Sequence, residues 1–303
     1  MEDTSIGLGN LSDALRLAGQ LRGAEAATCR ALVITREQDD HFREAISLYW
    51  LGLARAVRGI APESESALRR ALRMFVVQSH TQAEGHVNSH LAQRALWLGD
   101  PATARPLADR AWELAYDRRY ERDFIRAARL QGEAILKTFE VVRTSGSPET
   151  SKVSYADVRL HHALTCARVV NLVEEELPAL IALAELRRRQ GNLPAARELL
   201  DDVWESAERG PYPLFAADAF NVLAHIERDA GNLAAAIEAA TQAYRLAWCD
   251  GEPFAYHWGL VAARAHLREL GAPGPQLPPF DESKFGPMPE VEINPHDEFY
   301  VQV

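Results

Sequence analysis

Apolar residues recur along most of this chain at intervals of three and four, the spacing that places side chains on one face of an α-helix. One stretch contains Phe42, Ile46, Tyr49, Leu53 and Val57, and the next contains Leu68, Leu72 and Phe75. Short breaks separate such stretches, as at Gly99-Asp100-Pro101 and Gly191-Asn192. Glycine permits the left-handed conformation that ends a helix, and Asp, Asn or Pro beyond it begins the next one. The pattern therefore predicts a succession of helix pairs.

The helix pairs repeat with a regular period of about 40 residues, which is within the range of helical repeat units. Positions that follow the period are Leu11-Ser12, Leu51-Gly52, Leu91-Ala92, Gln131-Gly132, Leu183-Ala184 and Leu223-Ala224. A second series contains Ala31, Ala71, Ala111, Ala163, Val203 and Ala243. Both series carry the same interruption, which falls in the fourth pair. Two series with one period and one interruption indicate a repeat array.

Small residues occupy matching places on the two helices of a pair. The interval between them is the same from Gly52 to Ser64, from Ala92 to Ala104, from Ala184 to Ala196, and from Ala224 to Ala236. Small side chains there let the two helices approach closely. The spacing resembles the tetratricopeptide repeat (TPR), whose unit is about 34 residues, so longer helices are expected here. HEAT and armadillo arrays have a comparable period and remain the alternative, although they do not expect this small-residue spacing.

The expected fold is an all-α, right-handed superhelical solenoid of about six TPR-like helix pairs, followed by a lone terminal helix and an extended tail. The expected helices span residues 9–21 and 23–38, 41–58 and 62–79, 82–98 and 101–117, 121–138 and 153–170, 173–190 and 193–208, 213–230 and 233–248, and 254–270. The solenoid is expected to occupy residues 1–271. A polar insertion rich in Gly, Pro and Ser predicts a loop at residues 140–152.

Residues 272–303 form the predicted tail. Its seven prolines, from Pro273 to Pro295, preclude a long helix. Its apolar side chains, among them Phe280 and Ile293, are too many for a plain disordered segment. We therefore expect an extended, proline-rich segment that lies back over the solenoid.

The composition is that of an ordinary globular chain, with 47% hydrophobic and 25% charged residues. The net charge of -10 gives no electrostatic reason to bind nucleic acid or anionic lipid. The acidic start Met1-Glu2-Asp3 is unlike a secretory signal, and no apolar run is long enough to span a membrane. Three distant cysteines, Cys29, Cys166 and Cys249, are typical of reduced thiols. We expect a cytoplasmic protein.

The C-terminal third departs from a generic repeat. The segments that do so are 244–260, an aromatic run from Tyr244 to Leu260, together with Leu270-Gly271-Ala272-Pro273, Leu277-Pro278-Pro279-Phe280-Asp281 and 289–295. With residues 119–128, they resemble the C-terminal TPR sensor region of bacterial STAND, or NACHT-like, signalling ATPases. In that family a separate module carries the nucleotide-binding P-loop, and the repeats recognise a trigger, often an invader's protein in antiphage defence. The resemblance implies a protein or peptide ligand.

No G-x-x-x-x-G-K-[ST] motif occurs in the chain, so no ATPase activity is carried over from that family. The chain begins in the first repeat, and Met1 starts either a fragment or a short protein that docks on a separate partner. Partners can therefore include an N-terminal nucleotide-binding module or a separate effector. Two alternatives stay open: a stand-alone scaffold or adaptor, and an accessory subunit of a neighbouring effector enzyme.

Nothing in the sequence favours catalysis, a cofactor or a metal. His86 and His90 are spaced i, i+4, but no third ligand joins them at a suitable spacing. The adjacent His161 and His162 point to different faces of a helix. Carboxylate runs such as Asp201-Asp202 and Glu174-Glu175-Glu176 fall at helix starts or on faces where solvated charge is the usual interpretation. A non-enzymatic binding protein is the expectation.

The first helix of each pair is expected to line the concave surface of the solenoid. The repeat register then predicts the ligand-binding residues, which are Tyr49, His86, Ser89, Gln93, Arg126, Arg129, Glu133, Glu185, Arg188, Asp218, Asn221, His225 and Arg228. Arginine and asparagine can fix a peptide by bidentate or backbone hydrogen bonds. A second set, Trp248, Phe254, Tyr256, His257 and Trp258, is interpreted either as a cap on the last pair or as a recognition surface.

Overall fold

A computed structural model describes residues 2–138, 149–207 and 210–293 of the chain. Within these residues the fold is all-helical. The helices are α1 (Glu2–Leu17), α2 (Leu21–Glu37), α3 (His41–Val57), α4 (Ala61–Val77), α5 (Thr81–Trp97), α6 (Pro101–Arg118), α7 (Glu121–Thr138), α8 (Glu149–Val169), α9 (Val173–Arg189), α10 (Leu193–Ala207), α11 (Pro213–Asp229), α12 (Leu233–Ala247) and α13 (His257–Glu269). Each packs mainly on its neighbours in sequence, which confirms the predicted α-solenoid of six pairs and a lone terminal helix.

Residues in the left-handed conformation end the helices at regular intervals. Glycines that occupy this conformation in the turns directly after helices include Gly19, Gly59, Gly99, Gly191 and Gly231. Asp39, Ser79, Arg119 and Asn171 do the same although they carry a Cβ. A left-handed residue lets the last turn of a helix satisfy its free carbonyls before the chain reverses. The regular reversal produces the array of antiparallel hairpins.

Glycine at the predicted small-residue position lets two paired helices approach closely. A Cβ built on Gly52 would lie 2.7 Å from Cγ of Leu68, which belongs to the facing helix α4. Gly132 of α7 has the same relationship to Leu160 of α8, again at 2.7 Å. No real Cβ tolerates that contact, so the leucines pack directly on the glycine backbone. The same device therefore recurs two repeats apart.

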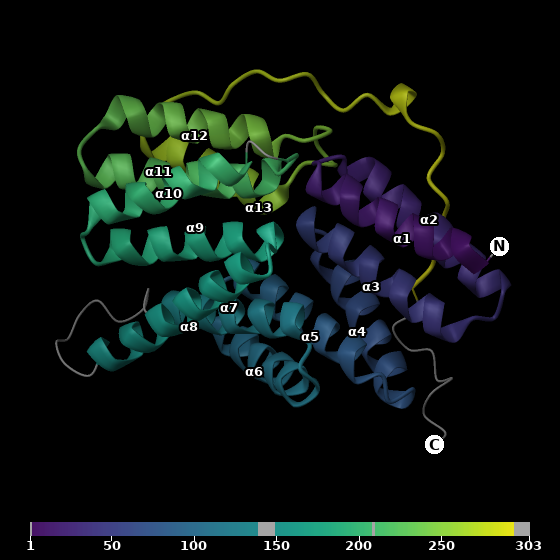
Figure 1. Ribbon diagram of the computed structural model, residues 1–303. Helices are drawn as coiled ribbons and strands as arrows, with labels where there is room; N and C mark the ends of the chain where they lie inside the picture. Colours follow the sequence, from purple (N-terminus) through teal and green to yellow (C-terminus); the bar gives the residue numbers. More distant parts are fainter. Residues whose placement is uncertain (1, 139–148, 208–209, 294–303) are drawn as a thin grey trace.

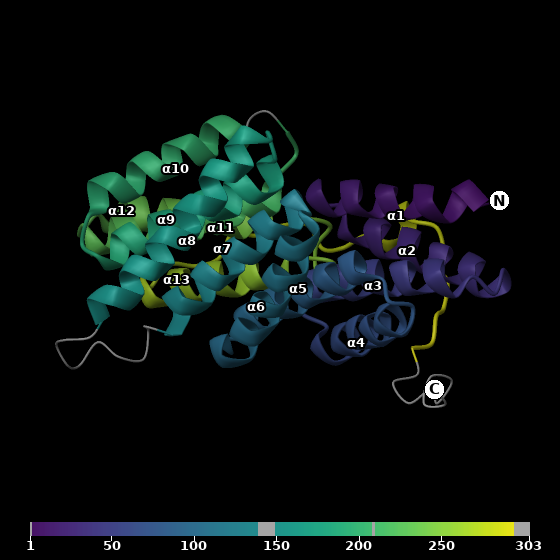
Figure 2. The ribbon, with the colours of Figure 1, turned by 60° about the horizontal axis from the view of Figure 1, so that its bottom comes forward.

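The array completes a turn, so its C-terminal end meets its N-terminal pairs (Figures 1 and 2). Pro213, at the start of α11, lies against Gly19 in the turn between α1 and α2. His257, the first residue of α13, lies against Gly59 in the turn between α3 and α4. A shared core joins Leu53 of α3 to Tyr256 and Leu260. The first and last parts of the solenoid are thus packed on one another, a contact that the repeat pattern did not predict.

The tail is extended over the described residues, apart from one 3-10 turn at Glu282–Lys284, labelled η2. It runs from the end of α13 across the molecule to the N-terminal pairs, as the yellow trace in Figure 1 shows. Met288, Val291 and Ile293 pack partly buried against the core of α2, α3 and α4. Residues 294–303, the end of the predicted tail, lie outside the described residues.

Two predicted boundaries are corrected by the structure. The first helix begins at Glu2 and ends at Leu17 instead of spanning 9–21, because the left-handed residue is Gly19. The predicted insertion loop at 140–152 ends earlier, since α8 begins at Glu149. Residues 139–148 lie outside the described residues. None of the described helices is both long enough and apolar enough to cross a lipid bilayer.

Candidate functional site

The predicted binding residues lie on α3, α5, α7, α9 and α11, helices that contact one another from pair to pair and that we call the inner side of the array, but much of that surface is covered. Tyr49, Ser89, Arg129 and Asn221 are buried, with exposed fractions of 6%, 1%, 6% and 7%. The remaining predicted residues are partly buried. The inner surface is therefore a packed polar layer between helices, and its role in binding remains a prediction.

Glu175 of α9 is at the centre of this layer. Its Oε1 lies 2.5 Å from Nε of Arg126, and its Oε2 lies 3.1 Å from Nε of Arg129. Arg129 also donates to Oε1 of Gln93, 3.1 Å away, and pairs with Glu133 on its own helix. These contacts join α5, α7 and α9, the first helices of three successive pairs. The side chain of Glu175 is only 2% exposed, so the interpretation of the Glu174-Glu175-Glu176 run as solvated charge is wrong for this residue.

The electrostatics of Glu175 follow from its two arginines. Burial alone would raise the pKa of its carboxyl, but Arg126 and Arg129 outweigh burial and hold the pKa below its usual value. The same attraction raises the pKa of Arg126 against the opposing effect of burial. The three side chains therefore stay charged over the whole physiological range. Breaking such a buried set by removing one partner is strongly destabilising, because the others remain desolvated.

Two histidines lie at the N-terminal end of the layer. Nε2 of His90 lies 2.9 Å from the hydroxyl of Tyr49 and 3.3 Å from Nη1 of Arg126. Burial, followed by the charge of Arg126, lowers the pKa of His90 well below its usual value, so this imidazole is neutral. His86 instead faces Asp123, with Nε2 and Oδ1 2.5 Å apart. The i, i+4 histidines thus have separate partners, and the described residues contain no group of three ligands for a metal ion.

The C-terminal end of the layer is more open. Arg188 is held by Glu185 on its own helix and by Asp229 at the end of α11. Arg228 donates to Nδ1 of His225 at 3.0 Å and to Oε2 of Glu269 in α13 at 2.7 Å. The side chains of Arg228 and Glu269 are 32% and 53% exposed, whereas that of Arg129 is 7% exposed. Ion pairs at this end can therefore exchange with an incoming charged group more readily than those around Glu175.

Asp218 and Asn221 of α11 connect the layer to the last helix. The hydroxyl of Tyr256 donates to Oδ2 of Asp218 at 2.9 Å, and Nδ2 of Asn221 donates to the carbonyl of Gly259 at 3.0 Å. Burial raises the pKa of Asp218 to about 7, against the opposing hydrogen bond from Tyr256. Asp218 is thus the predicted site residue whose charge changes near neutral pH.

The aromatic set lies where the array meets its own beginning. The indole N–H of Trp258 donates to the carbonyl of Ala56 at 2.7 Å, and its ring stacks on Trp97 with centroids 5.9 Å apart. The guanidinium of Arg58 lies 3.8 Å from the ring centroid of Phe254. Trp248 is held differently, because its indole donates to the carbonyl of Pro278 in the tail. These contacts are to the N-terminal pairs and the tail, a placement that neither sequence interpretation anticipated.

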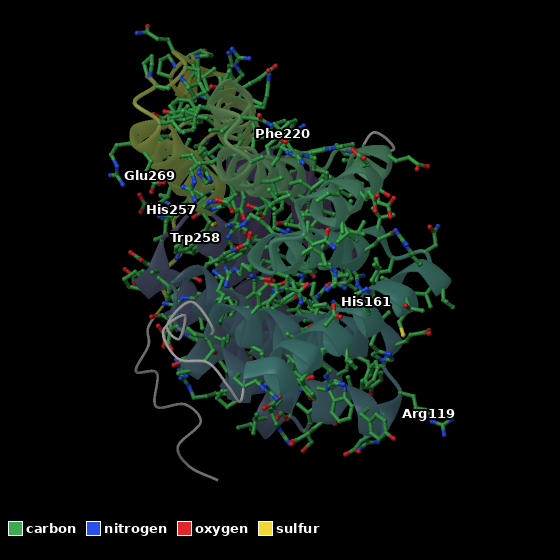
Figure 3. The ribbon with its side chains drawn as sticks, turned by 90° about the vertical axis from the view of Figure 1, so that its left-hand side faces the viewer. Arg119, His161, Phe220, His257, Trp258 and Glu269 are labelled. Carbon is green, nitrogen blue, oxygen red and sulfur yellow. The ribbon has the colours of Figure 1, made fainter. Side chains whose placement is uncertain are left out.

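Figure 3 shows His257 and Trp258 next to each other at one side of the molecule, near Glu269. His161 and Arg119 lie on the opposite side. We call residues 248–258 the closing segment, because they join α12 to α13 and contact the N-terminal pairs. His161 forms an i, i+4 contact with Asp157 on its own helix and takes no part in the inner layer.

Several residues of the inner layer were missed by sequence reasoning. Asp123 and Glu175 are buried carboxylates, yet neither was among the predicted site residues. Asp123 lies against His86 and accepts from Gln82, whereas Glu175 accepts from Arg126 and Arg129. A usable signal exists, since the two carboxylates occupy equivalent positions of the repeat once the interruption is counted. Equivalent positions face the same way in a solenoid, so the sequence could have predicted that Asp123 and Glu175 face the arginines of the inner layer.

Comparison with known proteins assigns this chain to no family, so its function is inferred from its structure. A scan against protein-family models finds no family that matches the chain. A search of curated proteins finds no match either.

Proposed function

We propose that this chain is a non-enzymatic binding protein that recognises a protein or peptide through the open, C-terminal end of its inner layer. The supporting observation is the row of arginine–carboxylate pairs that crosses from repeat to repeat and ends at the partly exposed Arg228–Glu269 pair. Arg188, Arg228 and Glu185 offer both charges close together, as a peptide with charged side chains requires.

The buried part of the layer has a structural role in this proposal. Arg126 and Arg129 are neutralised by Glu175 and Glu133 largely out of solvent, so the pairs that contain α7 and α9 are held in register. The Arg228–Glu269 pair instead exchanges one carboxylate partner for another at small cost, since both of its side chains are already partly hydrated. The ligand would therefore contact Glu185, Arg188, His225 and Arg228, while Tyr49, Ser89, Gln93 and Arg129 support the surface from below.

We further propose that the chain is the sensor part of a STAND-type signalling ATPase in the bacterial cytoplasm, with a role in antiphage defence. This proposal rests on the resemblance of the aromatic segment around Trp248–Trp258 and of the tail. The closing segment offers a physical basis for autoinhibition, because a trigger that opens the contact with Ala56 and Arg58 would change the shape of the whole array. We assign the chain no catalytic role, no cofactor and no nucleic-acid or membrane partner.

Affinity capture from infected and uninfected bacterial cells tests the binding proposal. The inner variant is Arg188→Gln with Arg228→Gln, which removes two partly exposed guanidiniums. The matched control is Arg69→Gln with Arg105→Gln, because these arginines pair within single outer helices, α4 and α6. A partner found by mass spectrometry is then purified and titrated against all three proteins by calorimetry.

The proposal expects one partner to bind the unaltered chain and the control equally, and the inner variant at least about tenfold more weakly, as loss of two charge-assisted contacts predicts. A partner that binds all three proteins equally would place the site elsewhere.

The sensor proposal has its own test. It expects a P-loop module in the same or the adjoining reading frame, and it expects ATP hydrolysis by that module to rise when the partner is added. An isolated reading frame would favour a scaffold instead.

A further inference from the structure

A second candidate site lies where the tail, the closing segment and the N-terminal pairs meet. It is an open pocket of about 680 Å³, within the size range of small-molecule sites. Its polar lining consists of Glu25 from α2, Arg55 and Arg58 from the end of α3, and Glu63 and Ser66 from α4. Its apolar lining consists of Ile60, Pro62, Phe254, Met288, Val291 and Ile293. No residue of this pocket belongs to the open end of the inner layer.

Two arginines of the pocket share one buried carboxylate. Nε of Arg55 donates to Oε1 of Glu25 at 3.1 Å, and Nη1 of Arg58 donates to Oε2 of the same carboxylate. Two arginines and one glutamate carry a net positive charge. The side chains of Arg58 and Glu25 are 7% and 4% exposed, so this charge lies largely out of water. Arg22 adds a third guanidinium nearby, with Cζ 5.5 Å from the centroid of the Phe254 ring.

The neighbouring carboxylates do not neutralise the positive charge of these arginines. Glu63 lines the pocket but is exposed to solvent. Asp250 accepts from the backbone N–H of Arg22, and burial raises its pKa, which disfavours its charged form. Burial, followed by the charge of Arg22, lowers the pKa of Arg58 to about 10, the direction expected for a cation that lacks full compensation.

The arginines also have donors to spare. Among the described residues, no acceptor is hydrogen-bonded to Nη1 or Nη2 of Arg55 or to Nη2 of Arg58. Arg58 is fixed in place by its other nitrogens, because Nε donates to the carbonyl of Pro253 at 3.0 Å and Nη1 to Glu25. A fixed guanidinium with a free edge is well arranged to receive an oxyanion.

The opposite wall of the pocket is apolar and is supplied largely by the tail. Met288, Val291 and Ile293 are partly buried, while Glu290 and Glu292 between them are exposed. The tail is held here by few polar contacts, one of which is the donation from Nη2 of Arg22 to the carbonyl of Gly286 at 2.9 Å. An apolar group bound in the pocket would bury part of these side chains.

We propose that this pocket binds an amphipathic anion, whose carboxylate or phosphate head group is received by Arg55 and Arg58 and whose apolar body lies against Phe254 and the tail. This site is separate from the proposed protein-binding surface and does not depend on it. The head group supplies the negative charge that Glu25 alone does not provide for the two arginines. The apolar body contacts Val291 and Ile293, so the bound ligand also holds the tail on the N-terminal pairs.

Calorimetric titration of the full chain with four probes tests the proposal. Octanoate and octyl phosphate carry an anionic head and an apolar body, octanol lacks the charge, and inorganic phosphate lacks the body. The proposal expects octanoate or octyl phosphate to bind at least about tenfold more tightly than octanol and than inorganic phosphate, as a charge-assisted contact with a desolvated arginine predicts. The tighter of the two amphiphiles identifies the head group.

Variants that remove a positive or a negative charge from the pocket distinguish an effect on ligand binding from an effect on folding. Arg55→Gln should weaken binding of the tighter amphiphile about tenfold, whereas Glu25→Gln should strengthen it, because it frees further guanidinium donors. Ser66→Asp places a carboxylate in the pocket and should abolish binding without loss of thermal stability. Arg69→Gln on the outer side of α4 is the control and should change nothing.

A purely structural role of the cluster predicts a different set of results. In that case Arg55→Gln and Glu25→Gln lower thermal stability together and change binding in the same direction. Octanol binding as tightly as octanoate, inorganic phosphate binding as tightly as either amphiphile, or no binding of any probe at millimolar concentration would each overturn the proposal.

Discussion

The indole N–H of Trp258 donates to the carbonyl of Ala56, 2.7 Å away, across 202 residues of sequence. The contact joins the last helix of the array to the end of α3 and therefore closes one turn of the solenoid. The carbonyl of Ala56 lies in the last turn of α3, where no partner exists within the helix, and it also accepts from the backbone N–H of Gly59 at 3.1 Å. Stacking on Trp97 covers the same indole from another repeat. The stability of the closed arrangement should accordingly depend on this one side chain.

Trp258→Phe and Trp258→Ala separate the two parts of that contact. Phenylalanine keeps a stacking ring but loses the hydrogen bond, so unfolding free energy should fall by about 1 kcal/mol. Alanine loses both and should cost about 2–4 kcal/mol. Chemical denaturation measures the two values. Trp204→Phe, within α10 and away from the closing segment, is a control for loss of an indole. Equal effects of Trp258→Ala and of an exposed substitution would show that the closure contributes no stability.

Glu175→Gln tests the buried ion-pair layer. The substitution keeps the shape of the side chain but leaves Arg126 with no carboxylate at hydrogen-bonding distance, and Arg129 with Glu133 alone, within the part of the chain that the structure describes. Because the guanidiniums stay desolvated, the free energy of unfolding should fall by about 3–5 kcal/mol.

The matched control is Asp202→Asn. Asp202 pairs with Arg168 on the surface, and both side chains are nearly half-exposed, so its loss should cost no more than about 1 kcal/mol. Denaturant titrations of both variants at one salt concentration give the comparison. A loss at Glu175 as small as that at Asp202 would mean that the inner layer is hydrated and loosely held.

Asp218 should make stability depend on pH near neutrality. Its folded pKa of about 7 lies above the ordinary value of 3.8, so the fold favours the protonated form. The contribution of Asp218 is therefore fully present below about pH 4 and is lost as pH rises through 7. Asp218→Asn keeps the acceptor for Tyr256 but removes the charge. The difference in free energy of unfolding, Asp218→Asn minus the unaltered chain, should increase by on the order of 1–3 kcal/mol between pH 5 and pH 8. The same difference at both pH values would contradict the raised pKa.

Gly52→Ala tests the close approach of paired helices. The added Cβ would meet Leu68 of α4 at 2.7 Å, so the helices must separate or the leucine must move, at a cost of about 1–3 kcal/mol. Gly7→Ala in α1 is the control, because nothing lies within 4 Å of the position its Cβ would take. Alanine there should stabilise the helix by about 0.5–1 kcal/mol. The melting temperature should fall for Gly52→Ala and rise for Gly7→Ala. A change in the same direction for both variants would contradict this account.

Local features of the fold could be predicted from the sequence, and distant contacts could not. Helix ends follow from glycines such as Gly59 and Gly99, and the inward-facing positions follow from the repeat register. The contact between Trp258 and Ala56 depends instead on the small rotation at each repeat, summed over six pairs. A sequence pattern does not encode that sum.

The candidate site shows the same division. The register identified Arg126 and Arg129 as inward-facing, but their partner Glu175 sits among three consecutive glutamates, of which Glu174 and Glu176 are partly exposed. The position of α9 relative to α7 buries Glu175, and the sequence sets this residue apart only through its register equivalence to Asp123. Asp218 was predicted as a site residue from register alone, whereas its raised pKa requires knowledge of the packing around Tyr256.

Small-angle X-ray scattering from the full chain in dilute solution tests the closed array most directly. An array whose closing segment is packed on the N-terminal pairs should scatter as a compact domain, with a radius of gyration of about 19–20 Å for its length. Its pair-distance distribution should be a single symmetric peak, and Trp258→Ala should broaden it. A markedly larger radius for the unaltered chain, with a long tail in the pair-distance distribution, would show that the solenoid is open and would contradict the account.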